Sequence, residues 1–434
     1  MARVPVTRMR DILAAYLSYG LERVQGILGI LVFLGLAWLL SEGRREVRLL
    51  PVAAGLAIQF SIAFVLLRIP VAREGLLVLN HVVDAIETAT TAGASLVFGF
   101  LGGGEVPFAL TAETAPYIFA FRILPQILVF SVLVAVLWYW RVLPVGIGGF
   151  SWALRRSLGV GGAVGLAASA SVFLGMVEAP LAIRAHLARL SRSELFVVMT
   201  CGMSTVAGSI MVLYANLLTD VIDGALGHVL IASVVNVIGA VVVARVMIPE
   251  QGATEDADPG DELRYASVMD AISRGTMDGL RLVVNVGAMV IVLVSLVALV
   301  NHVISGLHVA GGALTLERMA GWAFAPVAWL MGVEWSEASF AGTLLGVKVV
   351  LNELIAYIQL GAADVGVLSE RARLIMTYGL CGFTNFGSVG ILIGGLSALV
   401  PERRAEVLRL APRTLISGTI VACMTGAIAG LVTS

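Results

Sequence analysis

Long apolar runs alternate with short polar stretches along the chain. A helix needs about 17 to 25 mostly apolar residues to cross a bilayer. Runs of suitable length occur at 24–40, 49–68, 116–140, 197–218, 227–247, 280–300, 371–398 and 412–433. The pattern therefore predicts an all-α polytopic membrane protein with about eight transmembrane helices.

Two stretches break this pattern in the same way. The apolar run 157–174 reaches the polar tip GMVEAP and then continues for too few residues to cross again. In the second half, short apolar pieces at 320–334 and 340–351 end at a tip formed by Asn352 and Glu353. Both stretches are typical of re-entrant helical hairpins, whose half-helices direct their peptide dipoles toward the bilayer interior.

The two halves of the chain repeat one plan. SRSELFVVMTCGMSTVAGS (191–209) echoes LSERARLIMTYGLCGFTNFGS (368–388), and each follows a hairpin and precedes one further span. This predicts an inverted repeat with a central site between its halves. Four parts are expected. Residues 1–145 form N-terminal scaffold helices with an interfacial helix, and residues 146–250 form the first repeat. Residues 251–315 form a connecting part with an acidic loop, an interfacial helix and a span, and residues 316–434 form the second repeat.

Three stretches are too polar to span. Residues 1–23 carry several arginines on an amphipathic pattern, and residues 74–101 carry His81, Asp84 and Glu87 within an apolar pattern; helices of this kind lie at the membrane interface. Residues 250–262 form an acidic loop without core-forming residues. Arginines flank the first span on both sides, so their count does not fix its orientation.

The composition agrees with a membrane class and narrows the chemistry. The chain is 59% hydrophobic and 13% charged, with a formal net charge of -1, so no basic face for nucleic acid is expected. The three cysteines lie in apolar stretches and the five histidines show no ligand spacing. Neither a disulfide framework nor a structural metal site is predicted.

Polar side chains gather in the apolar runs of the second half. They are Lys348, Asn352, Glu353, Asn385 and Ser388. Such groups are costly in a membrane unless they meet a partner, a ligand or water, so the cluster predicts a solute site. Polar contacts between helices are the alternative, and they account for Ser and Asn better than for Lys348 with Glu353. Since these two are off the i, i+4 spacing, we expect Lys348 to stabilise the hairpin tip and Glu353 to bind.

Long ordered strings carry a resemblance to a known family. They are FAFRILP (119–125), EAPL (178–181), SELFVVM (193–199), GWAFAPVAWLMGV (321–333), LNELIAY (351–357) and CGFTNFGSVGILIGGL (381–396). Over essentially its whole length the chain resembles the concentrative nucleoside transporter family. The resemblance implies a homotrimer in the bacterial cytoplasmic (inner) membrane, with a scaffold and an elevator-like transport part that contains both hairpins. It implies cation-coupled nucleoside uptake, no enzymatic activity and no cofactor beyond the coupling ion.

By matching position, the resemblance also implies a substrate site with two sides. On the ribose side, Glu353, Asn385 and Ser388 would bind the sugar hydroxyls, and Phe383 would pack near the ligand. On the base side, the family commonly has Gln and Thr before the hairpin's Glu. Here those positions are Met176 and Val177, followed by the retained Glu178, with Ile210 at a further base-packing position. Base selectivity is therefore expected to shift toward shape and apolar contact.

The same resemblance implies an ion site in the first half. The matching positions are the side chains of Ser171 and Thr205 and the carbonyls of Leu174 and Val206. Hydroxyl and carbonyl oxygens suit a hard cation, which narrowly favours Na⁺. Ser171 is shorter than the Asn that sodium-coupled members use, and Glu178 or Glu353 could instead carry a proton.

Three other functions fit parts of the pattern. One is a proton-coupled transporter of a different nucleoside-like solute. Another is a passive channel or facilitator, which the two hairpins disfavour because they would build an occluded site that must move. The third is an intramembrane enzyme that uses Glu178 and Glu353 as acid and base, but no nucleophile or metal-ligand set accompanies them.

Overall fold

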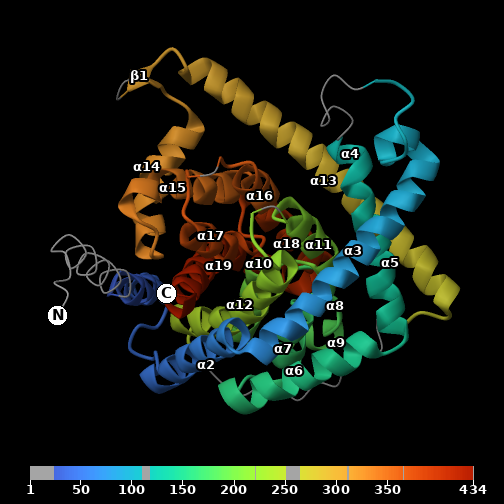
Figure 1. Ribbon diagram of the computed structural model, residues 1–434. Helices are drawn as coiled ribbons and strands as arrows, with labels where there is room; N and C mark the ends of the chain where they lie inside the picture. The colour runs from blue at the N-terminus through green and yellow to red at the C-terminus, as the bar shows by residue number, and fades with distance from the viewer. Residues whose placement is uncertain are drawn as a thin grey trace, which may run out of the picture.

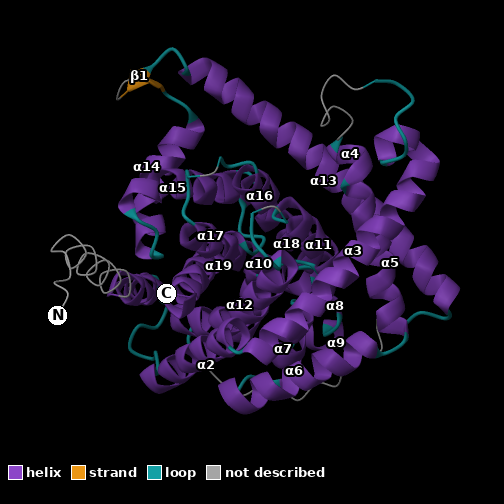
Figure 2. Ribbon diagram, viewed as in Figure 1, coloured by secondary structure: helices purple, strands orange, loops and turns teal. Residues whose placement is uncertain are grey.

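The computed structural model describes residues 24–109, 118–219, 221–250, 264–309, 312–364 and 366–433. Helices account for most of these residues, which confirms the all-α class (Figures 1 and 2). One short antiparallel pair joins β1 (His308–Val309) to β2 (Gly312–Ala313). The predicted segment 1–23 and all but the first residue of the acidic loop 250–262 lie outside the described residues.

The helices follow the predicted runs. In chain order they are Val24–Leu39, α2 (Leu49–Arg68), α3 (Pro70–Phe98), η1 (Gly99–Gly102), α4 (Phe119–Arg122), α5 (Leu124–Tyr139), α6 (Val142–Leu158), α7 (Gly162–Ala170), α8 (Glu178–Leu181), α9 (Arg184–Leu187), α10 (Arg192–Ser204), α11 (Gly208–Leu217), α12 (Ala225–Met247), α13 (Val268–Ile304), α14 (Leu316–Leu330), α15 (Trp335–Val350), α16 (Glu353–Gly361), α17 (Glu370–Leu380), α18 (Phe386–Leu399), η2 (Pro401–Arg403) and α19 (Arg404–Thr433).

Length and composition single out six candidate membrane spans among the described residues. They are α2, α4 with α5, α10 with α11, α12, α13, and η2 with α19. Val24–Leu39 and α18 are apolar but shorter. Each predicted span thus contains an apolar helix, while the number that cross the membrane stays a prediction.

Two predicted spans are not continuous helices, a feature that the hydropathy pattern did not predict. The run 197–218 breaks between α10 and α11, and the run 371–398 breaks between α17 and α18. The Gly-, Ser- and Thr-rich middles are where the helices stop. Thr205 is extended, and Gly382 takes a φ of 114°, which glycine adopts without the steric cost of a side chain.

Both predicted hairpins have the form of helix, break and helix. The first runs from α7 through a turn to the one-turn helix α8 and then to α9. In the second, α15 ends at Val350 and α16 begins at Glu353, with the Asn352 side chain accepting a hydrogen bond of 2.9 Å from the Ile355 amide. This cap starts α16 at the position where the tip was predicted. Their depth in a membrane remains a prediction.

The centre of the molecule is formed by α10, α12 and α19 (Figure 1). Most residues of these three helices are buried. The long helix α13 lies along the outside, where only Ala271, Gly275 and Gly279 are buried. Gly275 and Gly279 lie against α5, where an added Cβ would come within 2.9 Å of Val132 Cα and 3.0 Å of Leu128 Cα. Small residues at this contact let the two helices approach closely.

A cluster of ion pairs joins three segments at one end of the molecule. Glu42 follows the first helix, and its Oε1 lies 2.8 Å from Arg192 at the start of α10 and 2.6 Å from Arg413 in the first turns of α19. The hydrogen bond from Arg192 lowers the pKa of Glu42 below its ordinary value of 4.5. The cluster therefore contributes stability only where this carboxylate is ionised.

Glu42→Gln tests this contribution. Because the folded state lowers the pKa of Glu42, the contribution is fully present above its ordinary pKa and is lost as the pH falls through the lowered value. We expect the variant to lose about 0.2 to 1 kcal/mol at pH 7, a solvent-screened value, as a small drop in Tm. The difference in Tm between variant and wild type should shrink as the pH falls below 4.5, the ordinary pKa of this carboxyl. Glu402→Gln, an exposed acid at the same end, is the control; equal losses in both variants would contradict the cluster's role.

Candidate functional site

The two broken helices cross at their breaks. A Cβ on Gly382 would lie 2.6 Å from the carbonyl oxygen of Ser204, so only glycine allows this approach. Asn236 of α12, which is fully buried, donates its side-chain amide to Ser204 O at 2.7 Å and to Cys381 O at 3.4 Å. One side chain thus satisfies carbonyls freed by both interruptions.

Glu353 lies beside this crossing and is 4% exposed. Its Oε1 accepts a hydrogen bond of 2.7 Å from the Tyr214 hydroxyl on α11, and its Oε2 accepts one of 2.9 Å from the Asn385 amide at the start of α18. Glu353 is also the first residue of α16, where the helix dipole favours a negative charge. A single carboxylate thereby joins the second hairpin to both broken helices.

The structure brings the predicted ribose-side residues together. Asn385 Oδ1 accepts a hydrogen bond of 2.7 Å from the Ser388 amide and caps α18, while the Asn385 amide group faces Glu353. Ser388 and Phe383 are 5% and 8% exposed, and Phe383 lies in the break just before the cap. The cap fixes Asn385 in the one orientation that presents its NH₂ to the carboxylate.

Tyr214 is a site residue that the sequence reasoning missed. Its ring lies 4.5 Å from that of Tyr357, centroid to centroid, and the Tyr357 hydroxyl donates to Thr377 O at 2.8 Å. A tyrosine inside an apolar helix is usually read as packing. The signal available in the sequence was Tyr357 in the LNELIAY string. A buried tyrosine hydroxyl near Glu353 needs a polar partner, and a second tyrosine packed beside it has the same need.

Lys348 has a different role from the predicted one. It is 1% exposed, and its Nζ donates to Gly379 O at 2.9 Å and to Cys381 O at 3.3 Å. Lys348 therefore caps the end of α17 rather than its own hairpin tip, because the interruption leaves carbonyls there that attract a cation. Among the described residues, no ion pair within 4 Å links Lys348 to Glu353.

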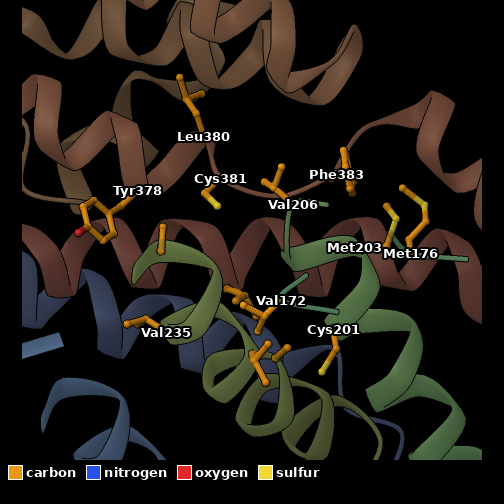
Figure 3. Close-up of a cluster of buried hydrophobic side chains, with 14 of the residues drawn as sticks. Val172, Met176, Cys201, Met203, Val206, Val235, Tyr378, Leu380, Cys381 and Phe383 are labelled. Carbon is orange, nitrogen blue, oxygen red and sulfur yellow. The ribbon is translucent and has the colours of Figure 1, made fainter. Parts of the chain in front are cut away.

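The predicted base-side residues are spread over the first hairpin tip and α11. Met176 is buried against α10, where a Cβ on Gly202 would lie 3.2 Å from Met176 Cα, and Figure 3 shows it next to Met203. Val177 packs against Gly395 of α18. This contact packs the first hairpin against α18, the helix that Asn385 caps.

Ile210 and Glu178 complete the predicted base-side set. Ile210 is 6% exposed on α11, the helix that also carries Tyr214. Glu178 is exposed, and its Oε2 lies over its own turn, 2.2 Å from where a Cβ on Gly175 would be. No hydrogen bond within the described part of the chain joins Glu178 to Glu353, so the two acids do not form a pair here.

The four predicted ion ligands lie on two adjoining breaks. A hydrogen bond of 2.9 Å from the Gly208 amide to Phe173 O joins the turn after α7 to the break between α10 and α11. The candidates are all buried: Ser171, Leu174, Thr205 and Val206. The hydroxyls of Ser171 and Thr205 donate to Ala168 O at 2.7 Å and Cys201 O at 3.0 Å. Each hydroxyl oxygen still has a lone pair for a cation, so the residues fit a small hard ion.

Three protein-family models match the chain. The model described as Na⁺ dependent nucleoside transporter N-terminus matches residues 28–101, and the one described as nucleoside recognition matches residues 120–220. The model described as Na⁺ dependent nucleoside transporter C-terminus matches residues 228–430. Together these matches contain every candidate site residue.

Proteins similar to the chain come from bacteria and mammals. An uncharacterized transporter of Haemophilus influenzae is 35% identical over 419 residues, which cover 94% of this chain and 97% of the relative. The nucleoside permease NupC of Helicobacter pylori is 32% identical, with coverage of 93% and 96%. The sodium/nucleoside cotransporter 1 of Rattus norvegicus is 32% identical over 94% of this chain and 64% of its own length.

Solved structures of similar shape represent two states of one transporter. CNTnw in an inward-facing substrate-bound state aligns with a TM-score of 0.86 at 33% identity, covering 95% of this chain and 98% of CNTnw. A variant of CNTnw in an outward-facing state aligns with the same TM-score, identity and coverage. The fold of the chain is thus similar to a protein that has been seen open to either side.

Lys348→Met tests the cap at the end of α17. The change keeps the apolar stem and removes the ammonium donor, which leaves Gly379 O without this partner and Cys381 O with only the Asn236 amide at 3.4 Å. An unpaired buried carbonyl costs about 1 to 3 kcal/mol. We expect a clear fall in the Tm of the purified protein in detergent, measured by intrinsic fluorescence. Lys348→Gln, which keeps an amide donor, should fall between wild type and Met. A Met variant as stable as wild type would show that the cap contributes nothing.

Proposed function

The chain belongs to the concentrative nucleoside transporter family, a family of transporters rather than enzymes, and on this basis we propose that it takes up nucleosides together with Na⁺. The observation that carries the proposal is the buried carboxylate of Glu353, which Tyr214 and Asn385 hold where the two halves meet. Its two oxygens can accept two vicinal sugar hydroxyls through charge-assisted hydrogen bonds.

Ribose would bind by exchanging partners with groups that are already oriented. The Asn385 amide donates to Glu353 at 2.9 Å, and a sugar hydroxyl between them could accept from the amide and donate to the carboxylate. Ser388 and Phe383 lie on the same segment, where a hydroxyl and an aromatic face suit a sugar and its base. A ligand without these hydroxyls would leave the buried groups unpaired, which costs about 1 to 3 kcal/mol each.

Base selectivity would follow from the first hairpin tip. Met176 and Val177 offer bulk without hydrogen-bonding side chains, and both pack on helices that border the site. With Ile210 on α11 they would form an apolar wall, and Glu178 is the remaining polar group of the tip. We therefore infer that the base is selected by shape and apolar contact rather than by direct side-chain hydrogen bonds.

Na⁺ is the coupling ion that the first-half breaks favour. Ser171 and Thr205 supply hydroxyls, and Leu174 and Val206 supply carbonyls, all on segments joined by the bond from Gly208. One charge moving across 100 mV provides about 2.3 kcal/mol, and a tenfold gradient adds about 1.4 kcal/mol. Together these support an accumulation of roughly a few hundred-fold. Proton coupling through Glu178 or Glu353, with a different nucleoside-like solute, is the second candidate.

Transport would proceed by alternating access with an elevator-like movement. In this proposal the hairpins α7 to α9 and α15 to α16, with their broken partner helices, form the transport part within a homotrimer. The predicted parts 1–145, 146–250, 251–315 and 316–434 then correspond to scaffold, first repeat, connection and second repeat. Uptake against a gradient would separate this mechanism from a passive channel or facilitator.

The arginine distribution supports an orientation in the cytoplasmic membrane. The cluster at Glu42, Arg192 and Arg413 lies at the end of the molecule where α19 begins. Arg403 lies at the same end and donates to Leu187 O and Leu190 O, which follow the first hairpin. Cytoplasmic ends of spans carry an excess of arginine and lysine. We infer that this end faces the cytoplasm.

Glu353→Gln tests the ribose site. The change keeps the size of the side chain and removes the charge, so sugar hydroxyls lose charge-assisted bonds worth about 1.5 to 3 kcal/mol. We expect uptake of labelled uridine and adenosine into proteoliposomes to fall roughly 10- to 100-fold at low substrate concentration. Glu337→Gln, which alters an acid at the start of α15, should keep wild-type uptake. Unchanged uptake in Glu353→Gln would refute the assignment of the carboxylate.

Ser171→Ala tests the coupling ion. Uptake is measured under separately imposed Na⁺ and H⁺ gradients, and we expect Na⁺ to drive it. Loss of one oxygen ligand should raise the Na⁺ concentration for half-maximal uptake several-fold. Ser169→Ala is the matched control, because that hydroxyl is buried two residues earlier in the chain and makes no hydrogen bond within the described residues. Uptake driven by an H⁺ gradient alone would identify the proton as the coupling ion. No uptake with either gradient would mean that the protein transports another substrate.

A further inference from the structure

A cavity of about 900 Å³ lies away from the candidate substrate site, where the ends of several helices meet. The segment before α2, the end of α6, the turn into α7 and the end of α12 line it. Its charged residues are Glu46, Arg48, Arg155, Arg156, Arg245 and Glu250. Among the described lining residues, four arginines against two glutamates leave a net charge of +2, which favours an anion.

Two features of the wall favour an anion with oxygen acceptors. Arg245 is held in place by its bonds to Leu158 O and Gly159 O, and by an ion pair of 3.0 Å with Glu250. The cavity also includes Gly161, the residue before α7, where no side chain caps the helix. Guanidinium groups match the geometry of phosphate oxygens, and the amides at a helix start add to their attraction.

The surroundings of the cavity match a membrane interface. Trp152 lines it from α6 and is 68% exposed, and Val145 on the same helix is 73% exposed. The apolar helices α2 and α12, both candidate membrane spans, begin and end beside the cavity. Exposed tryptophan next to arginine is typical of the level of lipid headgroups. A phosphate that reaches this cavity can therefore remain attached to acyl chains in the bilayer.

We propose that the cavity binds the phosphate of an anionic phospholipid headgroup. Arg155 and Arg156 at the end of α6, Arg48 before α2 and Arg245 on α12 contact the headgroup, while the acyl chains follow the apolar exterior of the neighbouring helices. Basic pockets between spans at the cytoplasmic side are suited to such lipids. The arginine cluster at Glu42 lies on the neighbouring segment of the chain, which agrees with a cytoplasmic position.

The lipid would connect two parts of the molecule. Its headgroup touches α2 and α6 on one side and the start of α7 on the other. Ser171 follows the opposite end of α7, nine residues along the helix from Gly162. A bound headgroup would therefore anchor the base of the hairpin that carries the proposed ion ligands.

The experiment measures lipid binding to the purified full-length protein by native mass spectrometry, with phosphatidylglycerol, phosphatidylcholine and inorganic phosphate as probes. The variant Arg155→Gln with Arg156→Gln removes two charges from the cavity. The matched control, Arg404→Gln with Arg409→Gln, removes two exposed charges near the start of α19, outside the cavity. Arg48→Gln is a second cavity variant that leaves α6 unchanged. This readout does not depend on transport.

We expect phosphatidylglycerol to bind the wild type in preference to phosphatidylcholine. Its dissociation constant should rise roughly 10- to 30-fold in the Arg155, Arg156 variant and less than about 3-fold in the control. Arg48→Gln should weaken binding by a smaller factor. Equal weakening in cavity and control variants, or equal binding of the two lipids, would overturn the proposal. Displacement of the lipid by millimolar inorganic phosphate would contradict the proposal that the bound phosphate belongs to a lipid. The cavity would then be assigned to a soluble phosphate.

Discussion

Interrupted helices inside an apolar core must find hydrogen-bond donors for the carbonyls that each break exposes. No water is available in a bilayer interior to do this, and every unsatisfied group costs several kcal/mol. Here the donors are Asn236, which serves Ser204 and Cys381, and Lys348, which serves Gly379 and Cys381. The crossing can exist only because these two side chains come from helices that pack beside it. The candidate residues Thr205, Val206, Phe383 and Asn385 lie in or next to these breaks, and Glu353 bonds to Asn385 directly.

The same constraint explains how one carboxylate can be buried. Glu353 stands at a helix start and receives a phenol from one half and an amide from the other, so both oxygens are satisfied without a cation. Because Asn385 also caps α18, any shift of that helix would move the amide that faces Glu353. In the proposed function, substrate binding and the relative position of the two hairpins would therefore be coupled through a single residue.

Much of the architecture follows from hydropathy and repetition. The apolar runs located the helices, and the tip at Asn352 and Glu353 was placed correctly because an Asn cap leaves a local signal. The helix breaks were not predicted, since Gly, Ser and Thr also occur inside continuous spans. Tyr214 and the actual partners of Lys348 depend on contacts 139 and more than 30 residues away in sequence, which no local pattern encodes. The spacing of Lys348 and Glu353 argued against an i, i+4 pair, but it could not show that Lys348 reaches the end of α17.

The length of α13 carries a consequence for the membrane around the protein. Its 37 residues correspond to about 55 Å of helix, whereas a hydrocarbon core is about 30 Å thick. Its charged residues end at Arg281, and the uncharged remainder, residues 282–304, extends about 34 Å. That remainder fits the bilayer with only a modest tilt, so the first turns of α13 must emerge from it. In the predicted topology, the helix would place one hydrophobic boundary near Arg281 and set the depth of the parts packed against it.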